Sequence, residues 1–165
     1  MLENRVKSIY LGIGSNLGDR KKNIEKTKFK LITNNINIVD VSSYYESLSW
    51  PNPNKPKFLN IILKVITDHT AFELIKTLKN IENQMGRKKT IKNAPRICDI
   101  DIIDFRNKKV SDGLILPHPR MHTRNFVLLP LFEIDKNWIH PVLKLNIKKL
   151  LLSLPNSDIR SIKQI

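Results

Sequence analysis

The pattern of apolar and polar residues predicts four strands in the first two thirds of the chain. Stretches rich in β-branched and aromatic residues lie at residues 6–13, 36–45, 58–67 and 97–105. The stretch at 58–67 is apolar on both faces, which is typical of a strand in the middle of a sheet. A loop over residues 46–57 that contains three prolines precedes it. We therefore expect a sheet in which residues 58–67 occupy a central position.

Two helices are predicted between these strands. In the second, Thr70 and Glu73 match a capping box, in which each side chain satisfies a backbone N–H at the helix start. Gly86 is well placed to end this helix. Its apolar residues recur at helical spacing, at Leu74, Leu78, Ile81 and Met85. The first helix is expected to begin at Asp19, a favourable N-cap residue, and to run to about Asn34.

The predicted order is strand, helix, strand, strand, helix, strand. This order is typical of a ferredoxin-like βαββαβ core, an α+β fold in which both helices pack on one face of an antiparallel sheet. Residues 106–165 would form a C-terminal extension, with a segment at 124–134 that contains Pro130 and a helix opened by Asn146. We find no internal repeat or linker, so we expect one domain over residues 1–165.

Length and composition are those of an ordinary globular protein. The 165 residues are 41% hydrophobic and 27% charged. No stretch approaches the roughly 20 apolar residues that a membrane helix needs, and the first residues have no apolar signal core. Cys98 is the single cysteine, so an intrachain disulfide is excluded. From these observations we expect a cytoplasmic location.

The net charge of +14 allows two interpretations. Basic surfaces attract nucleic acids, and ferredoxin-like sheets serve in RNA recognition, so a small RNA-binding module is one hypothesis. The lysines, however, are scattered along the chain, as in a general compositional bias. A small substrate rich in phosphate satisfies the same charge balance. We favour this second interpretation and expect a monomer without a nucleic-acid or membrane partner.

The strongest candidate for chemistry is a pair of carboxylates in the strand predicted at 97–105. Asp99 and Asp101 are two residues apart, so they emerge on one face of the strand with their Cα atoms roughly 6–7 Å apart. Such a pair of oxygen ligands suits Mg²⁺ that also carries phosphate oxygens. Arg96 would add positive charge at the mouth of the same site. Solvated charge on a strand face is the alternative, which we disfavour because apolar residues flank the pair.

Further cations gather near predicted loops and element ends, at Arg87, Arg96, Arg120, Arg124, His118 and His122. Several arginines beside an Asp pair favour a clamp on a polyphosphate, because each guanidinium offers paired hydrogen bonds to phosphate oxygens. The glycines at 12, 14 and 18 fit neither a P-loop nor a dinucleotide-binding motif. We expect them to serve a tight turn or close backbone packing and to have no direct chemistry.

A flat ring is the second ligand feature that the sequence predicts. Trp50, Phe58 and Phe126 stand in or beside loops, where an aromatic side chain can stack on a ring, although each taken alone would more often pack in a core. Asn60 is the polar residue in an apolar strand, and its paired donor and acceptor suit the edge of a heterocycle.

Taken together, these segments resemble the 6-hydroxymethyl-7,8-dihydropterin pyrophosphokinase family of folate biosynthesis. The resemblance covers nearly the whole chain and is carried, in order, by residues 14–17, 41–45, 58–60, 82–87, 95–102, 117–121 and 126–134. It implies that the protein transfers the β,γ-pyrophosphoryl group of ATP to the hydroxymethyl oxygen of the pterin and releases AMP. A metal-dependent phosphohydrolase, which would release orthophosphate without an acceptor, is a further alternative.

The resemblance also implies a role for individual residues. Asp99 and Asp101 would hold two Mg²⁺ ions, while Arg87 and Arg96 would act as catalytic residues that grip the phosphates. The residues matching ATP-binding positions are Glu82, Ile102, His118 and Arg124. Those matching pterin-binding positions are Ser47, Leu48, Trp50, Phe58, Asn60 and Phe126. Asn93 stands where the family often has an aromatic residue that closes over the pterin.

Overall fold

The computed structural model describes residues 8–88 and 91–165. Its elements, in chain order, are β1 (Ile9–Ser15), α2 (Arg20–Thr33), β2 (Asn37–Val41), β3 (Tyr45–Ser47), β4 (Phe58–Ile66), α3 (Ala71–Gln84), β5 (Asp99–Phe105), the 3₁₀ helix η1 (Met121–Thr123), α4 (Asn125–Ile134), α5 (Ile147–Leu152), α6 (Asn156–Ser161) and β6 (Lys163–Gln164). The N-terminal residues of the strand predicted at 6–13 lie outside the described residues.

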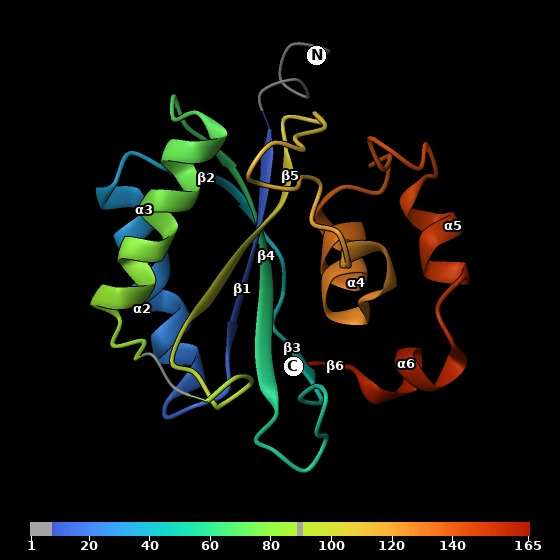
Figure 1. Ribbon diagram of the computed structural model, residues 1–165. Coiled ribbons are helices and arrows are strands. Elements are labelled where there is room, and N and C mark those ends of the chain that lie inside the picture. The colour runs from blue at the N-terminus through green and yellow to red at the C-terminus, as the bar shows by residue number, and fades with distance from the viewer. Residues whose placement is uncertain (1–7, 89–90) are drawn as a thin grey trace.

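The strands form one antiparallel sheet in the order β5-β1-β4-β3-β6, and β2 also pairs with β4. β1 lies between β4 and β5, so the strand that opens the chain and the strand that carries the Asp pair are direct neighbours. Figure 1 shows α2 and α3 together on one face of the sheet. The ferredoxin-like core predicted from the sequence is confirmed by this order and by the placement of both helices.

The C-terminal extension covers the opposite face of the sheet, so the molecule has three layers (Figure 1). α4 and α5 pack there around a smaller apolar cluster that includes Tyr10, Ile62 and Ile103 from the sheet. The larger cluster lies between the sheet and α2 and α3 and takes the alternate residues of the same strands, such as Leu11 and Ile102. The sheet is therefore apolar on both faces, and helices cover each of them.

The helix starts follow the sequence signals. Thr70 and Glu73 form the predicted capping box at α3, and the Asp19 side chain accepts from the Lys22 N–H at α2. Asn146 caps α5 in the same way, through the Lys149 N–H. No helix among the described residues is long and apolar enough to cross a membrane.

The strand predicted at 36–45 is divided into β2 and β3, both of which pair with β4. Between them, Ser42 keeps a backbone bond to Ile62, but the N–H of Ser43 donates to the Glu133 carboxylate on α4 at 3.0 Å. The Ser43 and Tyr45 hydroxyls also donate to Glu133, at 2.7 Å each. The Glu133 carboxylate on α4 therefore takes the place of the backbone hydrogen bonds of the sheet at this point, and the strand is interrupted there. Apolar periodicity alone does not predict this interruption.

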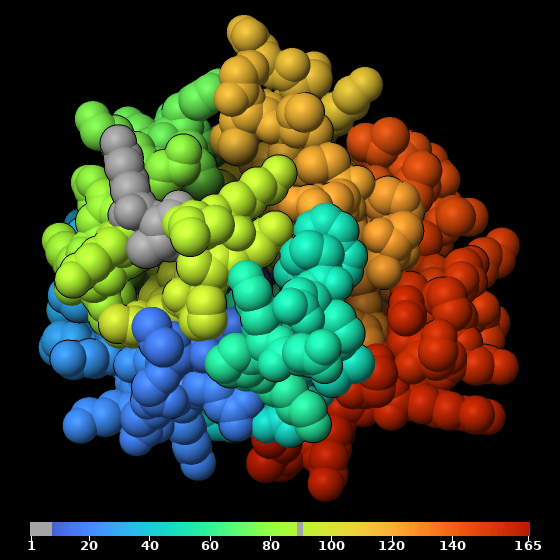
Figure 2. Space-filling view, turned by 60° about the horizontal axis from the view of Figure 1, so that its bottom comes forward, coloured from blue at the N-terminus to red at the C-terminus, as the bar shows by residue number. Residues whose placement is uncertain are grey.

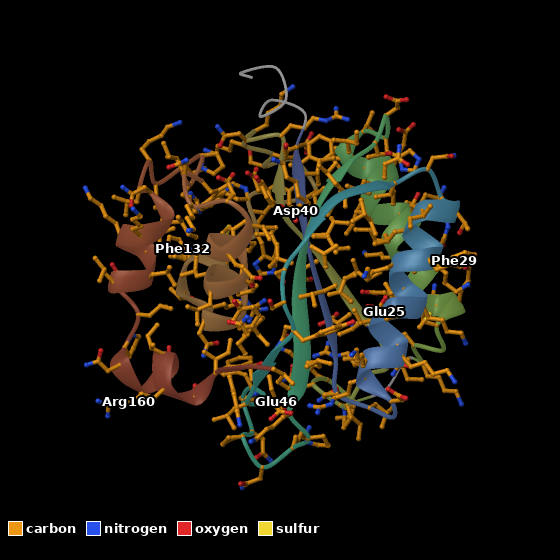
Figure 3. The ribbon with its side chains drawn as sticks, turned by 180° about the vertical axis from the view of Figure 1, so that it is seen from behind. Glu25, Phe29, Asp40, Glu46, Phe132 and Arg160 are labelled. Atoms are coloured by element: carbon orange, nitrogen blue, oxygen red, sulfur yellow. The ribbon has the colours of Figure 1, made fainter. Side chains whose placement is uncertain are left out.

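The outer face of α2 leaves apolar side chains in solvent. Figure 3 shows Phe29 projecting from this helix away from the sheet, and its side chain is 65% exposed. Ile32, one turn further along, is exposed as well. Glu25, also on α2, instead hydrogen-bonds the Tyr44 hydroxyl and helps to join the helix to the chain between β2 and β3.

Candidate active site

The two carboxylates lie on the sheet face that carries α4. In the pairing of β5 with β1, Asp99 is opposite Gly14 and Asp101 is opposite Gly12. The intervening Ile100 belongs to the core on the other face. Because side chains alternate along a strand, both carboxylates emerge on one side, as the sequence predicted.

Gly12 and Gly14 leave open the space opposite the carboxylates, a role that the sequence analysis missed. A Cβ atom at Gly14 would come within 3.3 Å of both the Phe58 ring and the Asn60 side-chain oxygen. At Gly12 it would come within 3.3 Å of the Ile103 side chain. The two glycines are therefore part of the floor of a cavity of about 340 Å³, a volume in the range of small-molecule sites.

The cavity brings together predicted site residues from distant parts of the chain. Those that line it are Ser47, Leu48, Trp50, Phe58, Asn60, Glu82, Arg87, Arg96, Asp99, Asp101, His118, Arg124 and Phe126. They come from β3, β4, α3, β5 and the start of α4, and from the segments between β3 and β4, between α3 and β5, and between β5 and α4. One pocket thus holds carboxylates, guanidinium groups and aromatic rings.

The Ile102 side chain lies outside this cavity. It is 3% exposed and packs in the core between the sheet and helices α2 and α3. The alternation that turns Asp99 and Asp101 toward the cavity turns Ile102 away from it. A contact of Ile102 with ATP is therefore left to its main chain and stays a prediction.

Three arginines contact the Asp pair. Arg87 Nη1 lies 3.1 Å from Asp99 Oδ1, and Arg96 Nη1 lies 3.8 Å from Asp99 Oδ2. Arg124 Nη1 lies 3.7 Å from Asp101 Oδ2. The cations that the sequence distributes over nearly 40 residues thus converge on two carboxylates, which is the composition expected of a polyphosphate site.

Glu82 positions one of these arginines. The residue is 7% exposed; Oε1 accepts from the Ile100 N–H at 2.8 Å and Oε2 contacts Arg87 Nη1 at 2.6 Å. Burial raises the pKa of Glu82, while the Ile100 N–H and the Arg87 charge oppose that rise. The residue joins α3 to β5 and holds the Arg87 guanidinium beside Asp99.

Burial dominates the electrostatics of the residues nearest the pair. It raises the pKa of Asp101 to about 6, and the negative charge of Asp99 adds to the rise. It lowers the pKa of His118 to about 4, with Arg124 and Arg120 contributing in the same direction. His118 Nδ1 accepts from the Arg120 N–H at 3.1 Å. The neutral imidazole therefore carries its proton on Nε2, which is a donor for an oxygen ligand.

A divalent cation fits the Asp pair only as part of a larger ligand. The described residues contain no group of three or more His, Cys, Asp or Glu side chains that could hold a metal ion. Asp99 and Asp101 supply two carboxylates, whose mutual repulsion a cation would relieve. Mg²⁺ commonly takes one or two protein carboxylates and completes its shell with phosphate oxygens and water. The donor set therefore suits a metal that arrives with a polyphosphate.

The other end of the cavity can recognise a heterocycle. Asn60 Nδ2 donates to the Ser47 hydroxyl at 2.9 Å and to the Tyr45 carbonyl at 3.1 Å. The donor half of the amide is thus used within the protein, and among the described residues we find no donor to Oδ1. The sequence predicted that Asn60 offers both its amide donor and its amide acceptor to a ligand. In the structure only the acceptor, Oδ1, is available for that role.

The two phenylalanines predicted to stack on a ring each carry a guanidinium over one face. The Arg96 guanidinium lies 5.9 Å from the Phe58 ring centre, and the Arg124 guanidinium lies 5.3 Å from that of Phe126. These contacts connect the aromatic end of the cavity with the cations at the Asp pair.

Two loops lie side by side at the mouth of the cavity. Figure 2 shows the teal segment that follows β3 against the yellow-green segment that precedes β5. Lys55 Nζ donates to the Asn93 carbonyl at 2.9 Å, which joins them. Asn93 itself lines the cavity with φ of 62°, a left-handed conformation that asparagine tolerates better than an aromatic residue does.

Arg120 also lines the cavity. The sequence analysis named it as one of a group of cations and predicted no specific contact for it. Its guanidinium lies 5.7 Å from the centre of the Trp50 ring, which is 67% exposed. His122, from the same predicted cluster, instead packs edge-on against His140, with ring centres 5.9 Å apart. The sequence placed both near the site because they are close in the chain; the 3₁₀ helix η1 turns them in different directions.

Comparison with known proteins gives a consistent result. The family model described as 7,8-dihydro-6-hydroxymethylpterin-pyrophosphokinase (HPPK) matches residues 10–136. A 2-amino-4-hydroxy-6-hydroxymethyldihydropteridine pyrophosphokinase of Aquifex aeolicus is 38% identical over 143 residues, which cover 86% of this chain and 89% of that protein. A folic acid synthesis protein of Dictyostelium discoideum is 43% identical over 149 residues; the match covers 90% of this chain but 22% of that protein.

The fold has counterparts among solved structures. A crystal structure of wild-type Plasmodium falciparum HPPK-DHPS with pteroate superposes with a TM-score of 0.68 at 17% identity. The match covers 87% of this chain and 41% of that one. At this identity the likeness supports the fold alone, and it shows that the arrangement of sheet and helices is shared.

Proposed function

Since the chain belongs to the 7,8-dihydro-6-hydroxymethylpterin-pyrophosphokinase family, we propose that it transfers pyrophosphate from ATP to 6-hydroxymethyl-7,8-dihydropterin, a step of tetrahydrofolate biosynthesis. The hydroxymethyl oxygen would form a bond to the β-phosphorus and lose its proton, while the bond from that phosphorus to the oxygen of the α-phosphate breaks. AMP and the pterin diphosphate would be the products. The convergence of three arginines on the Asp99 and Asp101 carboxylates in one cavity carries this proposal.

The polar end of the cavity would hold the triphosphate. Asp99 and Asp101 would bind two Mg²⁺ ions, which neutralise phosphate charge when bound. Arg87 and Arg96 would grip the phosphates as charge develops during transfer. Arg96 Nε supports this role, because it is buried and has no hydrogen-bond partner among the described residues. An acceptor oxygen from a ligand would satisfy it.

The nucleotide would contact Arg124, the Nε2–H of His118 and the region of Glu82. Arg124 is half-buried beside Asp101, so its charge is poorly screened and acts strongly on a nearby phosphate. Transfer of this kind depends on positioning and charge neutralisation more than on covalent help from the protein. The residues of the cavity supply both.

The pterin would occupy the aromatic end. Its flat ring would lie against Phe58 and Phe126, and Asn60 Oδ1 would accept from a ring N–H. Ser47, Leu48 and Trp50 would contact it from β3 and the loop that follows. Gly14 leaves the space beside Phe58 and Asn60 that this ring needs.

An assay of AMP release tests the proposal. The protein with MgATP alone should form little AMP, and addition of hydroxymethyl-dihydropterin should start rapid formation. Asp99→Ala and Asp101→Ala should each slow it by about 10²–10³-fold, the usual loss when an electrostatic contact to the transition state is removed. AMP formation that does not depend on the pterin, or normal turnover by both variants, would contradict the proposal.

The other hypotheses find less support. An RNA-binding module would use an open sheet face with exposed aromatic residues, whereas helices cover both faces here (Figure 1). A phosphohydrolase would release orthophosphate without an acceptor, which a measurement of orthophosphate in the reaction without the pterin would detect. We further propose that the protein is a cytoplasmic monomer that acts on small molecules, with no nucleic-acid or membrane partner.

A further inference from the structure

Arg120 differs from the other arginines that line the cavity. Those three lie between 3.1 and 3.8 Å from a carboxylate of the Asp pair. Over residues 8–88 and 91–165, by contrast, the Arg120 guanidinium forms no ion pair with a carboxylate and donates no hydrogen bond to the protein. Its N–H donors are therefore available to a ligand.

The Arg120 side chain is close to both ends of the cavity. Its guanidinium lies 5.7 Å from the ring centre of Trp50, which lines the end proposed for the pterin. Its charge also reaches the residues proposed to contact the nucleotide. Burial is the main reason that the pKa of His118 falls to about 4 and that the pKa of Arg124 is lowered, and the Arg120 charge adds to both effects. Arg120 therefore lies where a phosphate group attached to a pterin would be within its reach.

The cavity carries more positive than negative charge. Its described lining contains five basic side chains and three carboxylates, namely Lys79, Arg87, Arg96, Arg120 and Arg124 against Glu82, Asp99 and Asp101. Arg120 and Arg124 repel each other, and Asp101 offsets only the charge of Arg124. A bound anion would relieve this repulsion, which favours an anionic ligand beside Arg120.

We propose that Arg120 binds the diphosphate of the pterin product, an inference that rests on the proposed function. The pterin alcohol is neutral, so it offers no anion to a guanidinium at its end of the cavity. The triphosphate of ATP would be served by the metal ions and by the three arginines beside the Asp pair. The product carries a pterin and a diphosphate in one molecule, and Arg120 would donate paired N–H bonds to its phosphate oxygens.

Trp50 would hold the guanidinium in place for this contact. A cation is attracted to the face of an indole ring. The N–H donors of a guanidinium point outward in its own plane, so a contact with the ring does not use them up. A lysine at position 120 would keep the positive charge but would lose the planar fork that matches two phosphate oxygens. Arginine therefore suits this position better than lysine.

The test compares two ligands that differ only in the diphosphate. The dissociation constants of hydroxymethyl-dihydropterin and of its diphosphate are measured by calorimetry with Mg²⁺ present. Arg120→Ala should weaken binding of the diphosphate by about 10–100-fold, the usual range for loss of a hydrogen bond to a charged group. Binding of the alcohol, and of Mg²⁺ with α,β-methylene-ATP, should stay near the wild-type values. Arg120→Lys should weaken binding of the diphosphate by a smaller factor.

Arg160 provides a matched control for net charge. It is an exposed arginine on α6 and lies outside the cavity lining, and Figure 3 shows it on the outer side of that helix. Arg160→Ala removes the same charge as Arg120→Ala, so it should leave binding of both pterin ligands unchanged. Equal weakening of diphosphate binding by the two variants would reduce the role of Arg120 to that of general charge and would overturn the inference.

Three further results would overturn it. Arg120→Ala that weakens the alcohol and the diphosphate equally would show that the residue only supports Trp50. Arg120→Ala that weakens the ATP analogue as much as the diphosphate would assign the residue to the nucleotide. Unchanged binding of the diphosphate would leave it no ligand role; if Arg120→Ala does not fold, the same comparison is made with Arg120→Lys. A wild-type chain that binds neither pterin ligand would overturn the proposed function itself, which distinguishes the two failures.

Discussion

Arg87 Nη1 lies 3.1 Å from Asp99 Oδ1, so a guanidinium covers a carboxylate that we propose as a magnesium ligand. Arg124 has the same relationship to Asp101, at 3.7 Å. Each arginine reduces the repulsion between the two carboxylates in this arrangement. When MgATP binds, the metal would take over that task and release the arginines to contact phosphate oxygens.

Arg87 should therefore matter more for turnover than for binding. Arg87→Ala removes a charge that acts on the transferring group, so we expect kcat for AMP formation to fall by about 10²–10³-fold. The KM for ATP should change much less, because Arg96 and Arg124 remain. Steady-state kinetics check this, with the exposed neighbour Lys88→Ala as the control. A rise in KM with unchanged kcat would contradict it.

Gly14 should control the pterin end of the cavity. Gly14→Ala places a methyl group within 3.3 Å of Phe58 and Asn60, and we expect the KM for the pterin to rise by about tenfold through overpacking. At Gly12 the nearest neighbours of an added Cβ are the ends of the Ile103 and Ile62 side chains, which can adjust, so the effect of Gly12→Ala on that KM should be smaller. Equal effects of the two variants would show that the glycines serve packing alone.

Trp50 should report the binding of the pterin. It is 67% exposed, whereas the other tryptophan, Trp138, is buried and donates to Asp104 Oδ2 at 2.8 Å. Iodide should therefore quench mainly Trp50, and ligands that contact this side chain in the cavity should protect it. Iodide quenching is measured with and without the pterin and α,β-methylene-ATP, and Trp50→Phe should abolish the difference. Persistence of the difference in Trp50→Phe would refute this assignment.

Asp104 should make stability depend on pH. Burial raises its pKa from the usual 3.8 to about 6, despite the bond from Trp138. Between these values the folded state binds more protons than the unfolded state, so the free energy of unfolding falls as the pH rises. Asp104 should contribute about 2–3 kcal/mol to that fall. Denaturant titrations at pH 4 and pH 6 measure this fall, and Asp104→Asn should make it smaller. An equal fall in the free energy of unfolding of Asp104→Asn and of the wild type would contradict a raised pKa of Asp104.

Residues whose chemistry is local were predictable from the sequence. The capping box of Thr70 and Glu73 needs only its own helix, and the common face of Asp99 and Asp101 needs only the alternation of a strand. The split of the strand at 36–45 was not predictable, because it depends on Glu133 reaching Ser43 from the other layer.

The site shows the same division. Charged and aromatic residues could be identified as candidates from their side-chain chemistry. The family resemblance predicted that they form one site. Gly14 acts through neighbours that only the fold supplies, namely Phe58 and Asn60 on β4. Small and neutral residues of this kind carry no signal in composition or periodicity.

The most direct test of the central claim follows the phosphorus atoms of ATP. With ATP labelled at the β-phosphorus and hydroxymethyl-dihydropterin as acceptor, all transferred label should appear in the pterin product, with one AMP formed for each labelled pterin. Asp99→Ala should lose both signals together. Label recovered in ADP, or in pyrophosphate or orthophosphate without labelled pterin, would contradict the transfer of pyrophosphate by this site.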